Sequence, residues 1–150
     1  MKKLMTLVLF VGTTLSFTAC SSDDNSPVRV NNEYEGTWVT DSLFYQMGNF
    51  KGKHKFSEFP ADGVKEGEQV TKEILTLATT SATLQEFQKN GNKLPEASGT
   101  IEDKKTIVLK GSKVYEPRKI IGVTKTKLSL EYKIKMRGAE LPVTVTYIRK

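Results

Sequence analysis

Few side chains in this chain of 150 residues are suited to catalysis or metal binding, and the low counts of cysteine and histidine limit the kinds of site that it can form. There is one cysteine, Cys20, and one histidine, His54. A single thiol excludes an intramolecular disulfide, and a single imidazole excludes zinc motifs built on paired histidines. His54 lies in the basic stretch 51–55, and no acidic partner for a catalytic triad is evident. We expect a solvated surface histidine.

The thiol of Cys20 directly follows the longest uncharged run of the chain. Lys2 and Lys3 form a positive start, and the sixteen residues 4–19 carry no charge. The apolar part is shorter than the ~20 residues that cross a bilayer as a helix. Residues 1–19 therefore fit a secretory signal peptide better than a membrane anchor.

The end of this run carries a specific motif. Phe17-Thr18-Ala19-Cys20 resembles a bacterial lipobox, in which small residues precede a cysteine that receives a diacylglycerol on its sulfur. The resemblance implies cleavage before Cys20 and lipid attachment (palmitate included) at Cys20, although Phe17 departs from the common leucine. Two or more acyl chains hold a protein stably on a membrane, because each buried methylene contributes ~0.8 kcal/mol. The alternatives are an ordinary signal peptide cut after Ala19 and a buried cysteine without a special role.

Residues 20–34 read as the acylated cysteine and a polar, flexible linker. Its start, Ser21-Ser22-Asp23-Asp24, resembles the export signal of Bacteroidota lipoproteins, which lies beside the cysteine and directs them to the outer leaflet of the outer membrane. The resemblance implies a lipid-anchored outer-membrane protein exposed at the cell surface. The alternative is a polar tether with no sorting role.

From Gly36 onward, apolar and polar residues alternate with a period of two, which is typical of strands with one solvated face. The clearest run is 127–137, where five apolar residues from Leu128 to Met136 share one face. The expected strands are 37–47, 51–56, 72–80, 83–88, 97–102, 106–110, 119–124, 127–137 and 142–149. Eight or nine short strands between turn signals predict an all-β, antiparallel barrel or sandwich. Residues 73–88 could pass as a weak helix, but their threonines favour paired strands.

The longest connection between these strands is 58–70, which holds one proline, two glycines and several acidic residues. A connection of this length is long for a hairpin loop and is typical of a functional lid or a disordered segment. Disorder is the preferred interpretation.

Glu35-Gly36-Thr37-Trp38, which opens the first strand after the flexible lead, resembles the Gly-X-Trp start of lipocalins. The strand pattern of 35–150 resembles the compact lipocalin-like domains of Bacteroidota lipoproteins. The resemblance implies an eight- or nine-stranded up-and-down barrel over 35–150, with Trp38 closing one end. Such barrels can enclose one small molecule, in a cavity lined here by Trp38, Phe44 and other strand aromatics. The alternative, which is preferred, places most aromatic residues in a filled core. They are Phe44, Tyr45, Phe56, Phe87, Tyr115, Tyr132 and Tyr147.

Most of the sequence motifs that mark catalytic, phosphate-binding or metal-binding sites are absent from the sequence. No serine-nucleophile elbow, phosphate-binding glycine loop, zinc-protease motif or EF-hand loop occurs, so no catalytic residue, metal site or cofactor is expected. The formal charge of +6 raises the question of nucleic acid. However, the lysines of 127–137 alternate with apolar residues and are interleaved with Glu131, as on a solvated face, so nucleic acid is not expected as a partner. Attraction of an anionic glycan by this face is the alternative.

These observations favour a non-enzymatic cell-envelope lipoprotein over an enzyme. The first hypothesis is a carrier of a small apolar or amphipathic ligand, which requires a hollow barrel. The second is a protein-interaction module, either an accessory subunit of an outer-membrane complex or an enzyme inhibitor, with a filled barrel and an exposed patch near 58–70. A third is glycan binding by exposed aromatic residues beside the basic strands. The interior volume discriminates between the first two, since a ligand cavity measures roughly 300 Å³ or more.

Overall fold

The computed structural model describes residues 33–59, 63–136 and 138–150. The expected signal peptide 1–19, the expected lipid attachment site Cys20 and the linker as far as residue 32 lie outside the described residues. Within the described ranges, no helix has the length and apolar character needed to cross a membrane.

The described chain forms nine strands, and every strand expected from the alternation is present with bounds shifted by three residues at most. They are β1 (Gly36–Met47), β2 (Phe50–Lys55), β3 (Val70–Leu77), β4 (Ser81–Gln88), β5 (Ala97–Glu102), β6 (Thr106–Lys110), β7 (Arg118–Val123), β8 (Lys127–Met136) and β9 (Ala139–Arg149). Two single-turn 3-10 helices, η1 (Phe56–Glu58) and η2 (Glu66–Glu68), lie between β2 and β3. The segment that could have been a weak helix is the β3–β4 hairpin.

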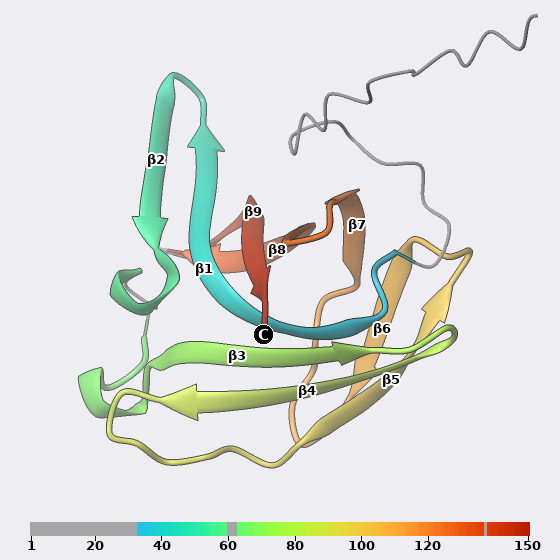
Figure 1. Ribbon diagram of the computed structural model, residues 1–150. Coiled ribbons are helices and arrows are strands. Elements are labelled where there is room, and N and C mark those ends of the chain that lie inside the picture. The colour runs from blue at the N-terminus through green and yellow to red at the C-terminus, as the bar shows by residue number, and fades with distance from the viewer. Residues whose placement is uncertain (1–32, 60–62, 137) are drawn as a thin grey trace, which may run out of the picture.

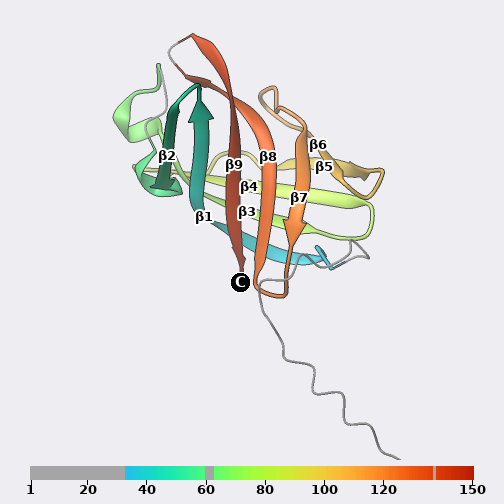
Figure 2. The ribbon, with the colours of Figure 1, turned by 90° about the horizontal axis from the view of Figure 1, so that it is seen from above.

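Eight of the strands close into a barrel. Neighbours pair antiparallel in the order β1-β3-β4-β5-β6-β7-β8-β9, and β9 pairs back onto β1. Strand β2 is an addition that pairs only with the second half of β1 (Figure 1). Figure 2 shows β1, β9, β8 and β7 side by side, with β3 and β4 crossing behind them. This confirms the predicted fold class, an all-β, antiparallel, up-and-down barrel.

Strand β1 changes phase near its middle. Its register with β9 shifts between Thr40 and Ser42, which marks a bulge. A bulge adds one residue to one strand, so the side chains beyond it move to the opposite face of the sheet. Trp38 faces the interior before the bulge and Leu43 faces it afterwards, which turns Phe44 outward with 40% of its surface exposed.

One end of the barrel, here named the closed end, is filled with side chains around Trp38. The indole of Trp38 is fully buried and its Nε1 donates to the backbone oxygen of Tyr34 at 2.7 Å. The guanidinium of Arg149 lies 4.3 Å from the centre of the Trp38 ring. Arg149 also donates to the backbone oxygens of Glu33, Glu35 and Lys125 at 2.8–3.0 Å. Residues 33–35, which precede β1, and the end of β9 are thereby joined at the closed end.

The connection 58–70 is only partly described, because residues 60–62 lie outside the described ranges. Residues 63–69 are attached to the turn that follows β4, which differs from the expected disorder. The backbone N–H groups of Lys89 and Asn90 donate to the oxygens of Gln69 and Gly67 at 2.8 and 3.0 Å. The ammonium of Lys89 pairs with Glu66. Backbone pairing to a neighbouring turn fixes this segment as one wall of the opposite end of the barrel.

Candidate functional site

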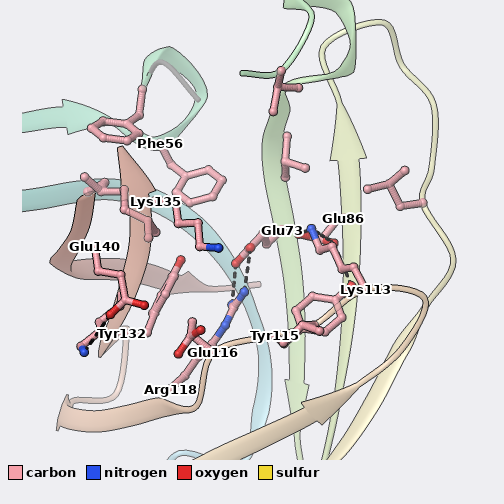
Figure 3. Close-up of a pocket in the computed structure, with 18 of the residues that line it drawn as sticks. Phe56, Glu73, Glu86, Lys113, Tyr115, Glu116, Arg118, Tyr132, Lys135 and Glu140 are labelled. Carbon is pink, nitrogen blue, oxygen red and sulfur yellow. Dashed lines mark hydrogen bonds and ion pairs between the residues drawn. The ribbon is translucent and has the colours of Figure 1, made fainter. Parts of the chain in front are cut away.

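A cavity of about 540 Å³ occupies the end of the barrel opposite Trp38, and this end is named the mouth. Its walls come from the first residues of β3 and β7, the second half of β8, helix η1 and the connections after β4 and β6 (Figure 3). Eight apolar side chains line it: Leu43, Phe56, Phe59, Val64, Val70, Leu94, Val114 and Ile134. These eight side chains, here named the apolar wall, come from segments far apart in the sequence.

The floor of the cavity is a buried ion pair between Glu73 on β3 and Arg118 on β7. Arg118 donates to both carboxylate oxygens of Glu73, at 2.7 and 2.9 Å. The Arg118 guanidinium also donates to the hydroxyl of Tyr147 at 2.7 Å, and that hydroxyl in turn donates to Glu73. The floor separates the cavity from the packed core around Trp38.

Burial and charge act against each other in the pKa values of this floor. Burial raises the pKa of Glu73, but the charge of Arg118 and the hydrogen bonds from Arg118 and Tyr147 outweigh it and leave that pKa below its ordinary value. Burial opposes the protonated form of Arg118, and the Glu73 charge outweighs it, so the pKa of Arg118 is raised. The carboxylate and the guanidinium are both charged at neutral pH, and each is matched by the other.

Tyr132 forms the side of the floor nearest β8. Its ring lies against the guanidinium of Arg118, with 4.5 Å between the guanidinium carbon and the ring centre. Burial, followed by the charge of Glu73, raises the pKa of Tyr132, so the phenol stays protonated. Figure 3 shows the Tyr132 hydroxyl and the end of the Lys135 side chain pointing toward one another beside Glu73. A neutral hydroxyl at this place can donate or accept a hydrogen bond.

A second carboxylate, Glu86 on β4, is held on the opposite wall. Lys113 donates to it at 2.9 Å and the hydroxyl of Tyr115 donates to it at 3.0 Å. Burial, together with the Glu86 charge, raises the pKa of Tyr115. Both partners belong to the connection between β6 and β7, so Glu86 fixes that connection against β4. This contact shapes the mouth without leaving a free charge inside it.

The charges of the lining almost cancel. Five carboxylates and four cationic side chains line the cavity. Three pairs account for six of these nine groups: Glu73 with Arg118, Glu86 with Lys113, and Glu140 with Lys133. Within the described residues, the others form no ion pair, and all three are exposed. They are Glu68, Glu116 and Lys135. The two charges buried at the floor thus match one another, and among the described residues Lys135 is the unpaired cation of the lining whose end reaches the floor beside Tyr132.

Among residues 33–59, 63–136 and 138–150, no group of three or more His, Cys, Asp or Glu side chains is placed to hold a metal ion. His54 is half-buried and stacks on Tyr45, with 5.8 Å between ring centres and an interplanar angle of 3°. It packs edge-on against Phe59 as well. The imidazole is part of an aromatic cluster beside the mouth and is less solvated than expected.

The two side chains named as barrel-closing or cavity residues, Trp38 and Phe44, both lie outside the mouth cavity. Trp38 is buried at the closed end, and Phe44 faces outward because of the bulge in β1. Neither is among the residues that line the mouth cavity; Phe44 borders a shallow outer hollow of about 150 Å³. Of the other aromatics, Tyr147 is fully buried, whereas Phe56, Tyr115 and Tyr132 line the cavity. The aromatic set is therefore divided between core and cavity.

The sequence reading missed the polar floor, although a signal for it exists. Glu73 precedes the buried Leu75 by two positions, Glu86 follows the buried Leu84 by two, and Arg118 precedes the buried Ile120 by two. A charged residue in the inward phase of a strand is costly to bury without a partner. Three such residues of both signs would have indicated an internal ion pair.

No protein-family model matches the chain, and no curated protein matches it. Among solved structures, it is similar to apocrustacyanin C2 (13% identity, TM-score 0.43) and apocrustacyanin C1 (13%, 0.45). It is also similar to lobster apocrustacyanin A1 (12%, 0.43). The alignments cover 79% of this chain and 61–62% of those chains, so the chain spans about three fifths of their length.

Proposed function

We propose that this chain is a non-enzymatic envelope lipoprotein whose lipocalin-like barrel binds one small, electrically neutral, amphipathic molecule in the mouth cavity. The observation that carries the proposal is the cavity itself. Its volume of about 540 Å³ lies within the range of small-molecule sites, roughly 300–1,000 Å³. A filled barrel would have favoured the alternative, a protein-interaction module.

The apolar wall supports an apolar body for the ligand. Phe56, Phe59 and Leu94 face the cavity together with five aliphatic side chains. Burial of apolar surface contributes about 25 cal/mol for each Å² removed from water. A ligand that covers this wall therefore gains its affinity from contact area, and the polar groups of the floor orient it.

The floor supports a neutral polar end. Arg118 is the only buried cation among the described residues, and Glu73 already occupies both of its donors that face β3. A carboxylate or sulfonate on a ligand would meet no free guanidinium and would lie beside Glu73. Burying an unpaired charge costs far more than burying a hydroxyl that finds a partner. The hydroxyl of Tyr132 supplies such a partner.

The location in the envelope is supported by the sequence. The lipobox ending at Cys20 and the Ser-Asp segment 21–24 support a lipid-anchored protein of the outer membrane, exposed at the cell surface. A membrane surface is also a source of amphipathic molecules of the proposed class.

A matched pair of probes tests the binding proposal. N-phenyl-1-naphthylamine and 1-anilinonaphthalene-8-sulfonate share one ring system and differ by a sulfonate. In fluorescence titrations of the full chain, we expect the neutral probe to bind about ten-fold more tightly or better, because a sulfonate at the floor would lie beside the Glu73 carboxylate and find Arg118 already paired. Leu94→Trp, which fills the cavity, should abolish the specific binding. Ile121→Trp, on the outer face of β7, should leave it unchanged.

A charge variant sharpens this test. Glu73→Gln releases Arg118 and should shift the preference toward the sulfonate probe. Equal affinity for both probes in the parent chain would overturn the neutral-ligand proposal. Binding that persists in Leu94→Trp would overturn the cavity as the site, whatever the behaviour of Glu73→Gln.

A further inference from the structure

The tip of the β1–β2 hairpin, defined as residues 47–50, exposes large apolar side chains. Met47 and Phe50 pair across the turn, with 52% and 75% of their surfaces exposed. In Figure 1 this hairpin stands away from the rest of the barrel. Met47 and Phe50 occupy the same face as the buried Leu43, since paired residues share a face and every second residue repeats it. No core residue covers them.

Lysines lie directly behind this tip on the other face of the hairpin. Lys51 pairs with Gln46 and Lys53 pairs with the outward-facing Phe44, and both lysines are exposed. Within the described residues neither of them forms an ion pair, whereas Lys55 pairs with Glu58 at 3.4 Å. Lysines on an edge strand deter strand-to-strand aggregation. That role does not account for the exposed phenylalanine at the tip.

We propose that the tip of the β1–β2 hairpin docks onto the surface of an anionic lipid bilayer. Met47 and Phe50 enter the interface, and Lys51 and Lys53 contact the phosphates. A strand rises about 3.4 Å per residue, so Lys53 lies about 10 Å behind Phe50. The headgroup region on each side of a bilayer is roughly 5–8 Å thick. Lys51 is thus at headgroup depth when the tip reaches the acyl boundary, and Lys53 lies just outside the headgroup region, where its extended side chain reaches back to the phosphates.

The dimensions of the tip favour a bilayer over a protein partner. A stable protein interface buries about 800 Å² on each partner, which two side chains at the end of a hairpin do not provide. An apolar tip backed by cations needs no shape complementarity to bind lipid, because apolar burial and attraction to anionic headgroups add together.

The same face of the hairpin is continuous with the mouth. Behind Met47 and Phe50 lie the stacked rings of Tyr45 and His54, and Phe59 packs edge-on against both at 6.0 and 5.8 Å between centres. Phe59 in turn lines the cavity. Docking at the tip therefore brings the mouth close to the lipid surface. The docking inference stands on the hairpin alone and does not require that the cavity bind a ligand.

A fluorescent probe at the tip tests the docking directly. The only native tryptophan, Trp38, is fully buried at the closed end, so the signal of a Phe50→Trp variant of the full chain is read as the difference from the parent. We expect a blue shift and quenching by brominated lipids in vesicles with about 30% phosphatidylglycerol, both lost at high salt. The matched control is Ile148→Trp, an exposed position on β9 near the closed end. It should show neither effect.

The lysines are tested in the Phe50→Trp background. Lys51→Glu and Lys53→Glu should each weaken vesicle-dependent quenching by about five-fold or more, as expected for a basic residue near an anionic surface. Attachment of the chain through its N-terminal region does not by itself place position 50 in lipid, so it does not produce the signal. Absence of quenching, or quenching equal to that of Ile148→Trp, would overturn the proposal. A blue shift that depends on protein concentration without vesicles would assign the tip to a second copy of the chain instead.

Discussion

Arg118 on β7 and Glu73 on β3 are joined across the barrel interior by two hydrogen bonds of 2.7 and 2.9 Å, with about 5% of either side chain exposed. The two strands are not neighbours in the sheet. The pair therefore links opposite walls of the barrel and supports the floor of the cavity. Its loss should be felt in the stability of the whole domain.

We expect Glu73→Gln and Arg118→Met each to lower the free energy of unfolding by about 3–5 kcal/mol, because each leaves one buried charge without its partner. The double variant Glu73→Leu/Arg118→Met should lose less than the sum, since no charge remains. Urea unfolding followed by circular dichroism measures both. Lys133→Gln, at the exposed pair with Glu140, is the control and should change stability far less. Additive losses would show that the pair is not coupled.

Acid should weaken the protein through the same carboxylate. The folded-state pKa of Glu73 is below its ordinary value of 4.5, as the charge of Arg118 outweighs burial. The stability that this shift contributes is present above pH 4.5 and is lost as the pH falls through the folded-state pKa. Thermal midpoints measured from neutral pH to about pH 3 should fall steeply in the parent chain and less steeply in Glu73→Gln. If the two chains lose stability in parallel, Glu73 is not the group responsible.

The Trp38–Arg149 contact should stabilise the closed end. Arg149→Ala removes the cation over the indole and three hydrogen bonds to backbone oxygens. We expect a loss of about 1–2 kcal/mol, because the guanidinium is exposed and water replaces part of its bonding. Arg149→Lys keeps the charge but not the planar fork, and it should recover only part of the loss. The neighbouring Lys150→Ala is the control in the same denaturant titration, and an equal effect there would exclude a specific role for the contact.

The proposed lipid anchor requires the single thiol of Cys20 and is tested by labelling. Cells that express the full chain should incorporate radioactive palmitate into it, and Cys20→Ala should abolish the label. Ser22→Ala, two residues further on, is the matched control and should keep it. Protease treatment of intact cells then tests surface exposure, which requires that the protein be digested. A label that persists in Cys20→Ala would reject the anchor.

The fold was predictable because its main signal is local. Alternation along 127–137 places Leu128, Leu130 and Tyr132 on one face whatever the neighbours are, and β8 has that arrangement. Phe44 was misplaced because a bulge near Asp41 reverses the phase of β1, and nothing in the local composition marks a bulge at that position. One extra residue was enough to exchange the inward and outward faces.

The cavity was harder to predict than the barrel. Its floor depends on Glu73 and Arg118, which are 45 residues apart and meet only when the barrel closes. Each was readable as a charged residue in the inward phase of its strand, but the pairing is a property of the tertiary structure. Whether an aromatic residue lies in the core or in the cavity also depends on the tertiary structure. Tyr147 and Tyr132 both lie in the inward phase of their strands, but Tyr147 is fully buried whereas Tyr132 lines the cavity.

In the described part of the chain, β6 and β7 share two residue pairs, Thr106 with Lys119 and Ile107 with Arg118, and the backbone N–H of Ile120 donates to the oxygen of Lys105 at 2.7 Å beside them. This short pairing ends at Arg118, which is also hydrogen-bonded to Glu73 on the opposite wall of the barrel. We expect thermal separation of β6 from β7 to be opposed at Arg118, which is the first paired residue of β7 on the side of the mouth.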